Sequence, residues 1–307
     1  MGTPDFAVPS LEALADSAYE IVAVYTQPDR ESGRGRQVVA PPVKRVAVSR
    51  GLGVLQPIKL RAREAIASVA NLAPELIVVA AYGHILPQEV LNLPRYGCIN
   101  VHPSLLPKYR GSSPIASAIL DGEKITGVTI MLLDEGMDTG PVLRQKEVPI
   151  SDEDTTGTLT AKLATIGAQS LLETLSHWIE ASIEPQPQDA SRATYSRQIT
   201  KEDGEINWQL SALDIWRRVR AFEPWPGSYT HWSGRRLKVI KAVPLSGEKM
   251  EEAGEVIALE QSSPAPVGVV TGNGILGLLS VQLEGKKEMS ANEFLPGQRG
   301  FIGSKLL

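Results

Sequence analysis

The stretch CINVHPSLLPKYRG, residues 98–111, ends an apolar run with two hydrogen-bonding side chains directly before a proline. Side chains alternate across a strand, so Asn100 and His102 share one face while their apolar neighbours share the other. Pro103 cannot donate a backbone hydrogen bond, so we expect the strand to end there. The pattern therefore predicts a strand that carries an amide and an imidazole at its carboxyl end.

Three more short apolar runs alternate with helical patterns in the same part of the chain: YEIVAVYT (19–26), ELIVVAAYG (75–83) and GVTIMLLD (127–134). Short Val/Ile/Leu runs separated by helices are typical of buried strands in an open, mostly parallel α/β sheet. Ligands of such sheets bind outside the carboxyl ends of the strands. We therefore predict an α/β domain over residues 1–184, with its binding site beside Asn100 and His102.

The rest of the chain differs in composition and in hydrophobic pattern. Residues 185–203 are polar and proline-containing, which is typical of a linker. Residues 204–307 contain one helical pattern and several short β-rich runs, and TGNG (271–274) is a hairpin-turn signal between two of them. We expect a small OB-like β-barrel as the second domain.

Composition narrows the function classes. The 307-residue chain has 42% hydrophobic residues and a net charge of -4, the profile of a globular protein that does not bind nucleic acid nonspecifically. No apolar run is long enough to span a bilayer and the first residues do not resemble a signal peptide, so a cytoplasmic location is expected. We expect no metal site, because there is a single cysteine and the four histidines lack ligand spacing: His84, His102, His177 and His231.

The amide and imidazole at one strand end suggest acyl-group chemistry. Two such groups aimed at one point can stabilise the oxyanion that develops when a nucleophile attacks a carbonyl. A histidine in this role needs a carboxylate to orient it, and DEGMDTGPV (134–142) offers Asp134, Glu135 and Asp138. The residues alone do not choose among the three carboxylates. The alternative to a catalytic role is a purely structural one, in which Asn100 and His102 only form hydrogen bonds within a turn at the strand end.

Cys98 lies on the same face as His102 and could act as a nucleophile. It stands deep in an apolar run, with no adjacent base or helix N-terminus to lower its pKa. The pattern favours a small buried hydrophobic residue.

Two basic clusters stand out in this acidic chain. QPDRESGRGRQVVAPPVKR (27–45) is glycine-rich and basic, and WRRVRAFEPWPGSYTHWSGRRLK (216–238) interleaves arginines with aromatic residues. Each cluster is a candidate for phosphate binding. The alternative for the first cluster is a solvated loop, and the alternative for the aromatic residues of the second is the core of a barrel. Two clusters together suggest one face that binds nucleic acid.

The chain resembles a known family through segments spread over nearly its whole length. These are MGTPDFAVPSLEAL, TQPDRESGRGR, APPVK, INVHPSLLPKYRGSSPI, DEGMDTGPV and ITKEDGEINWQLSALDIWRRVRAFEPWPGSY. They are similar to the 10-formyltetrahydrofolate-dependent formyltransferases, which have a Rossmann-like catalytic domain. The QPDRESGRGR loop and the AFEPWPGSY segment resemble the branch of the family that acts on tRNA.

The resemblance implies a reaction and a set of residues. The expected reaction transfers the formyl group of 10-formyltetrahydrofolate to the amino group of methionyl-initiator tRNA. The resemblance assigns catalysis to Asn100, His102 and Asp138. It implies folate contacts at Ser104, Leu105, Leu106, Pro107, His84, Ile85 and Leu86, and tRNA contacts at Arg34 and Arg36 foremost, with Arg30 and Lys44.

Two other functions remain open. An amino-sugar or other small-amine formyltransferase would keep the catalytic trio but would not need the basic loop. A noncatalytic tRNA-binding protein would keep the basic clusters and would tolerate loss of His102. We expect a monomer that needs no metal, and the resemblance leads us to expect a further apolar strand before MGTPDF.

Overall fold

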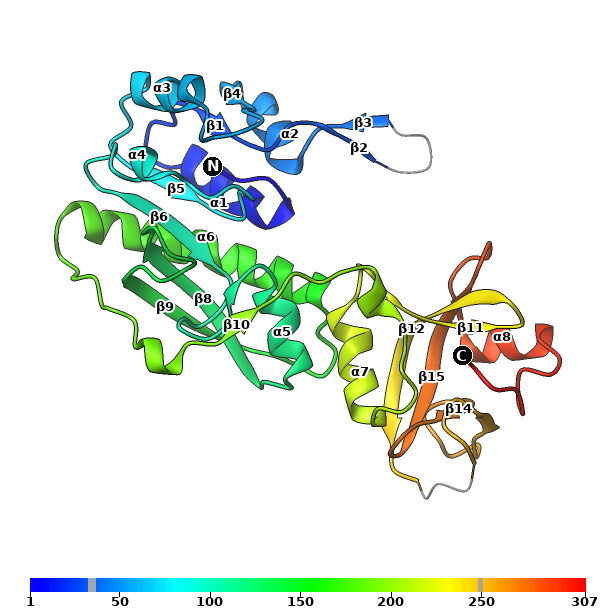
Figure 1. Cartoon of the computed structure of the whole chain (residues 1–307). Coiled ribbons are helices and arrows are strands. Elements are labelled where there is room, and N and C mark those ends of the chain that lie inside the picture. The colour runs from blue at the N-terminus through cyan, green and yellow to red at the C-terminus, as the bar shows by residue number, and fades with distance from the viewer. Residues whose placement is uncertain (33–36, 248–250) are drawn as a thin grey trace. The chain divides into compact units, whose positions relative to one another are not determined.

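The computed structural model describes residues 1–32, 37–247 and 251–307 and divides into two compact units (Figure 1). The first unit comprises Met1–Pro114, Lys124–Pro149 and Leu159–Arg197. The second comprises Ile115–Glu123, Ile150–Thr158 and Gln198–Leu307.

A four-stranded sheet forms the centre of the first unit. Its strands lie in the order β5 (Ile77–Val79), β6 (Cys98–His102), β8 (Ile125–Leu132) and β9 (Val142–Pro149). β5 and β6 are parallel, whereas β8 runs antiparallel to β6 and pairs with β9 as a hairpin. The apolar runs are confirmed as strands. The direction of β8 was not evident from its sequence, because a buried apolar run looks alike in either orientation.

The amino-terminal residues Met1 and Gly2 lie between β1 (Val24–Tyr25) and the end of β5. On its other side, β1 pairs in parallel with β4 (Val54–Leu55). Gly2 donates its backbone N–H to the carbonyl of Tyr25 (2.9 Å), while Ala80 donates to the carbonyl of Met1 (3.0 Å). Met1 and Gly2 therefore connect β1 to the strand that precedes Ala80, and a hollow of about 560 Å³ adjoins them.

Helices cover both faces of the sheet. They are α1 (Val8–Ala15), α2 (Pro42–Ser49), α3 (Arg63–Asn71), α4 (Gln88–Leu91) and α6 (Thr156–Ile179), with the 3-10 turn η1 (Asp5–Ala7). α6 approaches β6 closely at Gly167, where an added Cβ would lie 2.8 Å from Val101 Cγ1. On the opposite face Val69 of α3, Val90 of α4 and Cys98 of β6 share one apolar core. β6 is thus buried on both faces, and all five of its residues are buried.

Two further strand pairs lie outside the central sheet. β2 (Arg30–Ser32) and β3 (Gln37–Val39) are antiparallel and flank the glycine-rich part of the basic loop. β7 (Arg110–Gly111) pairs in parallel with β10 (Tyr195–Ser196). β10 and the 3-10 turn η2 (Ala190–Arg192) lie within the stretch expected as a linker.

The second unit is built on a curled antiparallel sheet. Its strand order is β11 (Ser228–Trp232), β12 (Arg235–Leu245), β15 (Ile275–Leu283), β14 (Val267–Val270) and β13 (Val256–Ala258), with β16 (Met289–Ser290) beside β15. This half-barrel bears out the prediction of a small β-rich domain. The TGNG signal is confirmed as the turn between β14 and β15, where Thr271 donates its N–H to the carbonyl of Gly274.

Helices and short 3-10 turns also belong to the second unit. They are α5 (Pro114–Leu120), α7 (Ala212–Ala221) and α8 (Ala291–Phe294), with the 3-10 turns η3 (Glu202–Gly204) and η4 (Leu295–Gly297). Ser211 caps α7 by accepting a hydrogen bond from the N–H of Asp214, and Ser290 caps α8 with a capping box. Trp232 packs edge-on against Phe294 and Phe301, so it belongs to the core, whereas Trp225 is 59% exposed. In the described ranges of the chain, no helix is long and apolar enough to cross a membrane.

Candidate active site

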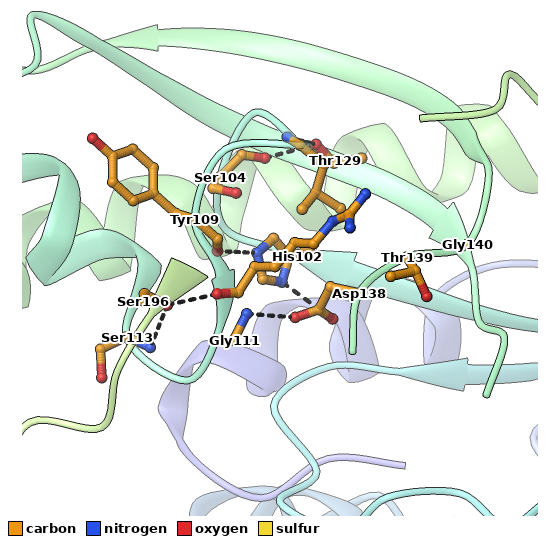
Figure 2. Close-up of polar contacts among 12 residues, drawn as sticks. His102, Ser104, Tyr109, Gly111, Ser113, Thr129, Asp138, Thr139, Gly140 and Ser196 are labelled. Carbon is orange, nitrogen blue, oxygen red and sulfur yellow. Dashed lines mark hydrogen bonds and ion pairs between the residues drawn. The ribbon is translucent and has the colours of Figure 1, made fainter. Parts of the chain in front are cut away.

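His102 and Asp138 lie side by side at the carboxyl end of β6 (Figure 2). His102 Nδ1 is 3.7 Å from Asp138 Oδ1, and the exposed fractions of the two side chains are 5% and 15%. The other carboxylate oxygen of Asp138, Oδ2, accepts the backbone N–H of Gly111 at 2.8 Å. The carboxylate is therefore held from one side by the backbone of β7, and its free oxygen faces the imidazole.

The second ring nitrogen of His102 determines its protonation pattern. Nε2 lies 3.0 Å from the carbonyl oxygen of Tyr109, which only accepts hydrogen bonds, so Nε2 carries the proton. In the neutral ring, Nδ1 is then the nitrogen with a lone pair. Burial lowers the pKa of His102 below its ordinary value, although the Asp138 carboxylate and the Tyr109 carbonyl partly oppose this. The arrangement can take up a proton at Nδ1 and stabilise it with Asp138.

The three carboxylates left open by the sequence have different surroundings. Asp134 Oδ1 accepts hydrogen bonds from the backbone N–H of Gly136 and the hydroxyl of Thr139, so this carboxylate stabilises the loop in which it lies. Glu135 is exposed. Of the three, Asp138 is the one that faces His102.

Asn100 lies two residues before His102 on β6, opposite Met131 of β8. It is 9% exposed, and the alternation of the strand puts its side chain on the same face as that of His102. Cys98 is on the same face but lies deeper, where its thiol faces the backbone carbonyls of Val90 and Leu91 at 3.9 Å. Burial raises the pKa of this thiol to about 12.

This pKa leads to a prediction for Cys98. At pH 8 a thiol with a pKa of about 12 is roughly 10⁻⁴ ionised, whereas an ordinary thiol is about one-quarter ionised. We expect iodoacetamide to label the folded protein at least about 10³-fold more slowly than the protein in denaturant. Cys98→Ala should keep turnover within about twofold of the wild type, since the thiolate takes no part in the reaction. Rapid labelling of the folded protein, followed by loss of turnover, would contradict this.

The turn after β6, which contains the folate contacts implied by the family, is fastened by two residues that the sequence did not single out. The Thr129 hydroxyl donates to the carbonyl of Ser104 (2.6 Å) and accepts the N–H of Leu106 (3.1 Å). Gln145 Nε2 donates to the carbonyl of Leu106 (2.7 Å) and to Thr129 Oγ1 (2.9 Å). Ser104 and Leu106 are buried, whereas Leu105 and Pro107 are partly exposed. The sequence signal for this network was limited to a polar residue in the mostly apolar β8, Thr129, and a polar residue in β9, Gln145.

The second segment with folate contacts implied by the family follows β5. Leu86 is buried, His84 is half-buried, and Ile85 is 68% exposed. Burial lowers the pKa of His84, and the positive charge of Arg30 lowers it further. Arg30 donates to Gln27 Oε1 at 2.9 Å. The structure thus brings Arg30, expected among the tRNA contacts, within electrostatic range of His84.

Lys44 is part of a polar cluster at the base of the β2–β3 pair. Its ammonium group donates to Asp29 (2.7 Å) and to Gln56 Oε1 (2.8 Å). Gln56 Nε2 in turn donates to Asp29 Oδ1 at 2.7 Å. Lys44 therefore already has carboxylate and amide partners. Arg34 and Arg36 lie outside the described residues.

Within the described part of the chain, no three His, Cys, Asp or Glu side chains come together in a way that could hold a metal ion. The polar groups at the mouth of β6 include the His102 imidazole, the Asn100 side-chain amide, the Asp138 carboxylate and the backbone N–H of Gly111. Such a set favours proton transfer and oxyanion stabilisation.

Comparisons with known proteins cover both units. Residues 1–175 match the family model described as formyl transferase, and residues 198–299 match that described as formyl transferase, C-terminal domain. The methionyl-tRNA formyltransferase of Dehalococcoides mccartyi is 49% identical over 306 residues, covering 100% of this chain and 96% of the relative. That of Bacillus pumilus is 46% identical over 306 residues, with the same coverage of 100% and 96%.

Solved structures with lower identity share the fold. HypX from Aquifex aeolicus in complex with tetrahydrofolic acid is 19% identical, with a TM-score of 0.60 over 92% of this chain and 48% of that chain. The N-formyltransferase from Helicobacter canadensis in complex with folinic acid and dTDP-3-aminofucose is also 19% identical, with a TM-score of 0.62 over 90% and 97%. At these identities the likeness concerns the fold alone.

Proposed function

This chain belongs to the formyl transferase family, and we propose that it transfers the formyl group of 10-formyltetrahydrofolate to the amino group of methionyl-initiator tRNA. The product is N-formylmethionyl-tRNA, which serves translation initiation. The observation that carries the proposal is the His102–Asp138 pair at the mouth of β6, in a chain that is 49% identical over its whole length to a methionyl-tRNA formyltransferase.

The proposed chemistry follows from the polar groups at this mouth. The amine of the methionyl group attacks the formyl carbon, and the carbonyl oxygen becomes an oxyanion. The Asn100 amide donates to this oxyanion, and the charge of protonated His102 stabilises it. The proton that the amine loses passes to Nδ1 of His102, directly or through water, and Asp138 stabilises the cation. Collapse of the intermediate breaks the bond to N10 of the folate, and N10 leaves with the proton that His102 took from the amine, directly or through water, so that His102 returns to its neutral form.

The folate is proposed to bind between two segments at the carboxyl ends of the strands. Ser104–Pro107 follow β6, and His84–Leu86 follow β5. β5 and β6 are parallel neighbours, so these segments emerge at the same edge of the sheet. The pterin ring would lie along the backbone of the second segment.

The tRNA is proposed to contact the basic loop through Arg34 and Arg36, and Arg30 would lie nearer the folate. The polar cluster of Asp29, Lys44 and Gln56 supports Lys44 as an anchor for the base of this loop. In this proposal residues 1–184 form the catalytic domain, 185–203 the connection, and 204–307 the tRNA-binding domain. The protein would act in the cytoplasm as a monomer.

We expect the double variant Arg34→Ala/Arg36→Ala to weaken tRNA binding about tenfold while kcat stays within about threefold. Loss of two phosphate contacts should also lower the salt dependence of binding. The slope of log Kd against log salt concentration should fall by roughly 1.5. Filter binding at several salt concentrations measures both quantities. Arg61→Ala/Arg63→Ala is the matched control, because it removes the same charge from exposed positions at the start of α3. Equal losses in both double variants would contradict a specific role of the loop.

The direct test is transfer of labelled formyl from 10-formyltetrahydrofolate to methionyl-tRNA. Unacylated tRNA and a nucleotide-linked amino sugar serve as alternative acceptors. Transfer that requires the methionyl group supports the proposal. Transfer to the amino sugar alone would identify a sugar formyltransferase, and tight tRNA binding without any transfer would identify a noncatalytic RNA-binding protein.

A further inference from the structure

Gln188 makes contacts at the active site although it lies 50 residues after Asp138 in the chain. Its amide nitrogen donates to the backbone carbonyls of Asp138 (2.8 Å) and Gly140 (2.7 Å). Its amide oxygen accepts from Nε (3.1 Å) and Nη2 (2.8 Å) of Arg110. A guanidinium only donates and a carbonyl only accepts, so these partners fix the orientation of the amide.

The loop that Gln188 holds has an unfavourable backbone. Asp138 adopts a left-handed conformation with φ of 53°, which costs free energy in any residue other than glycine. Gly140 packs so tightly that an added Cβ would lie 1.9 Å from the carbonyl oxygen of Leu132. The two hydrogen bonds from Gln188 stabilise the carbonyls on either side of Thr139 and so oppose relaxation of the loop.

Arg110 connects this support to the other contact of the Asp138 carboxylate. It is 3% exposed, and it directly precedes Gly111, whose N–H binds Asp138 Oδ2 at 2.8 Å. The strand pair β7–β10 joins Arg110 and Gly111 to Tyr195 and Ser196, soon after Gln188 in the chain. Two adjoining residues of β7 thus hold Asp138. Gly111 binds its carboxylate directly, and Arg110 supports its backbone carbonyl through Gln188.

We propose that Gln188, oriented by Arg110, is a positioning residue that keeps the Asp138 carboxylate in place beside Nδ1 of His102. The inference rests on the proposed function, since it concerns the same reaction. A catalytic group displaced by about 1 Å can cost as much as 10²-fold in rate. Gln188 touches neither substrate in this proposal, so its loss should change turnover and leave substrate binding intact.

Gln188→Glu is the most informative variant. The glutamate keeps an oxygen for Arg110 and forms an ion pair with it, which supports folding. It loses both N–H donors and turns a carboxylate oxygen toward the carbonyls of Asp138 and Gly140. We expect kcat for formyl transfer to fall roughly 10- to 100-fold, with KM for methionyl-tRNA and for the folate within about threefold.

Gln186→Glu is the matched control. It introduces the same charge two residues earlier, at an exposed side chain, and the backbone pairing of Gln186 with Val142 does not involve that side chain. This control should keep kcat within about twofold of the wild type. An equal loss in both variants would assign the effect to charge and overturn the inference.

A double-mutant cycle separates positioning from a merely structural role. If Gln188 acts through Asp138, Gln188→Glu should change the residual turnover of an Asp138→Ala protein by less than about twofold. A full additional loss in that background would overturn the inference, as would wild-type kcat in the single variant. A wild type that transfers no formyl group would instead refute the proposed function.

Titration of His102 by NMR gives a readout that does not depend on turnover. The charge of Asp138 raises the pKa of His102, so displacement of Asp138 lowers it. The new charge at position 188 would by itself raise it. A lower pKa in Gln188→Glu therefore supports displacement, and a higher pKa overturns the inference.

Discussion

Replacement of His102 by alanine lowers kcat for formyl transfer by about 10²- to 10³-fold, the loss that is typical when one group that stabilises an oxyanion is removed. Alanine can neither take up the proton of the attacking amine nor place a positive charge beside the oxyanion. Affinity for methionyl-tRNA should change little, because the imidazole is buried and contacts Tyr109 and Asp138. Single-turnover transfer, with tRNA binding measured separately, tests both statements.

His177→Ala is the matched control for this variant. His177 lies in the last turn of α6, where its ring is within hydrogen-bond distance of the Ser182 hydroxyl at 3.1 Å in an exposed position. Its loss should leave kcat within about twofold of the wild type. If the His102→Ala protein folds and turns over within about threefold of the wild type, the assignment of His102 as a catalytic residue fails.

Asp138→Asn should lower kcat by roughly 10²-fold and lower the pKa of His102. The carboxylate raises that pKa against the effect of burial, so its neutralisation leaves burial to act with less opposition. A neutral imidazole in the variant gains a proton less readily, which removes part of the driving force for deprotonation of the amine. Kinetics give the first effect, and NMR titration of labelled histidine gives the second.

Asp134→Asn provides the control for Asp138→Asn within the same loop. Asp134 Oδ1 accepts from Gly136 N–H and the Thr139 hydroxyl, and an asparagine oxygen can accept both bonds. This variant should therefore retain nearly all turnover and leave the pKa of His102 unchanged. A higher pKa of His102 in Asp138→Asn would contradict the direction derived from the His102–Asp138 geometry.

The elements of both units could be predicted where local patterns are strong. The alternation in residues 98–102, with a proline directly after, was enough to place Asn100 and His102 together at the end of β6. The TGNG turn was equally clear. The antiparallel direction of β8 was not, because buried runs carry no sign of their orientation.

Local sequence patterns were enough to predict the strand that bears the polar pair and the division into an α/β region and a β-rich region, and they carried the resemblance to the formyltransferases. The resemblance already pointed to Asp138, and the folded chain places it, rather than Asp134 or Glu135, beside His102. The contacts of Thr129 and Gln145 with the Ser104–Pro107 turn, and of Gln188 with the Asp138 loop, were visible only in the tertiary structure. The physical reason is range. Strand alternation and turn chemistry act between neighbouring residues, whereas Gln188 meets Asp138 and Arg110 across 50 and 78 residues of chain, and only the folded sheet brings those backbones together.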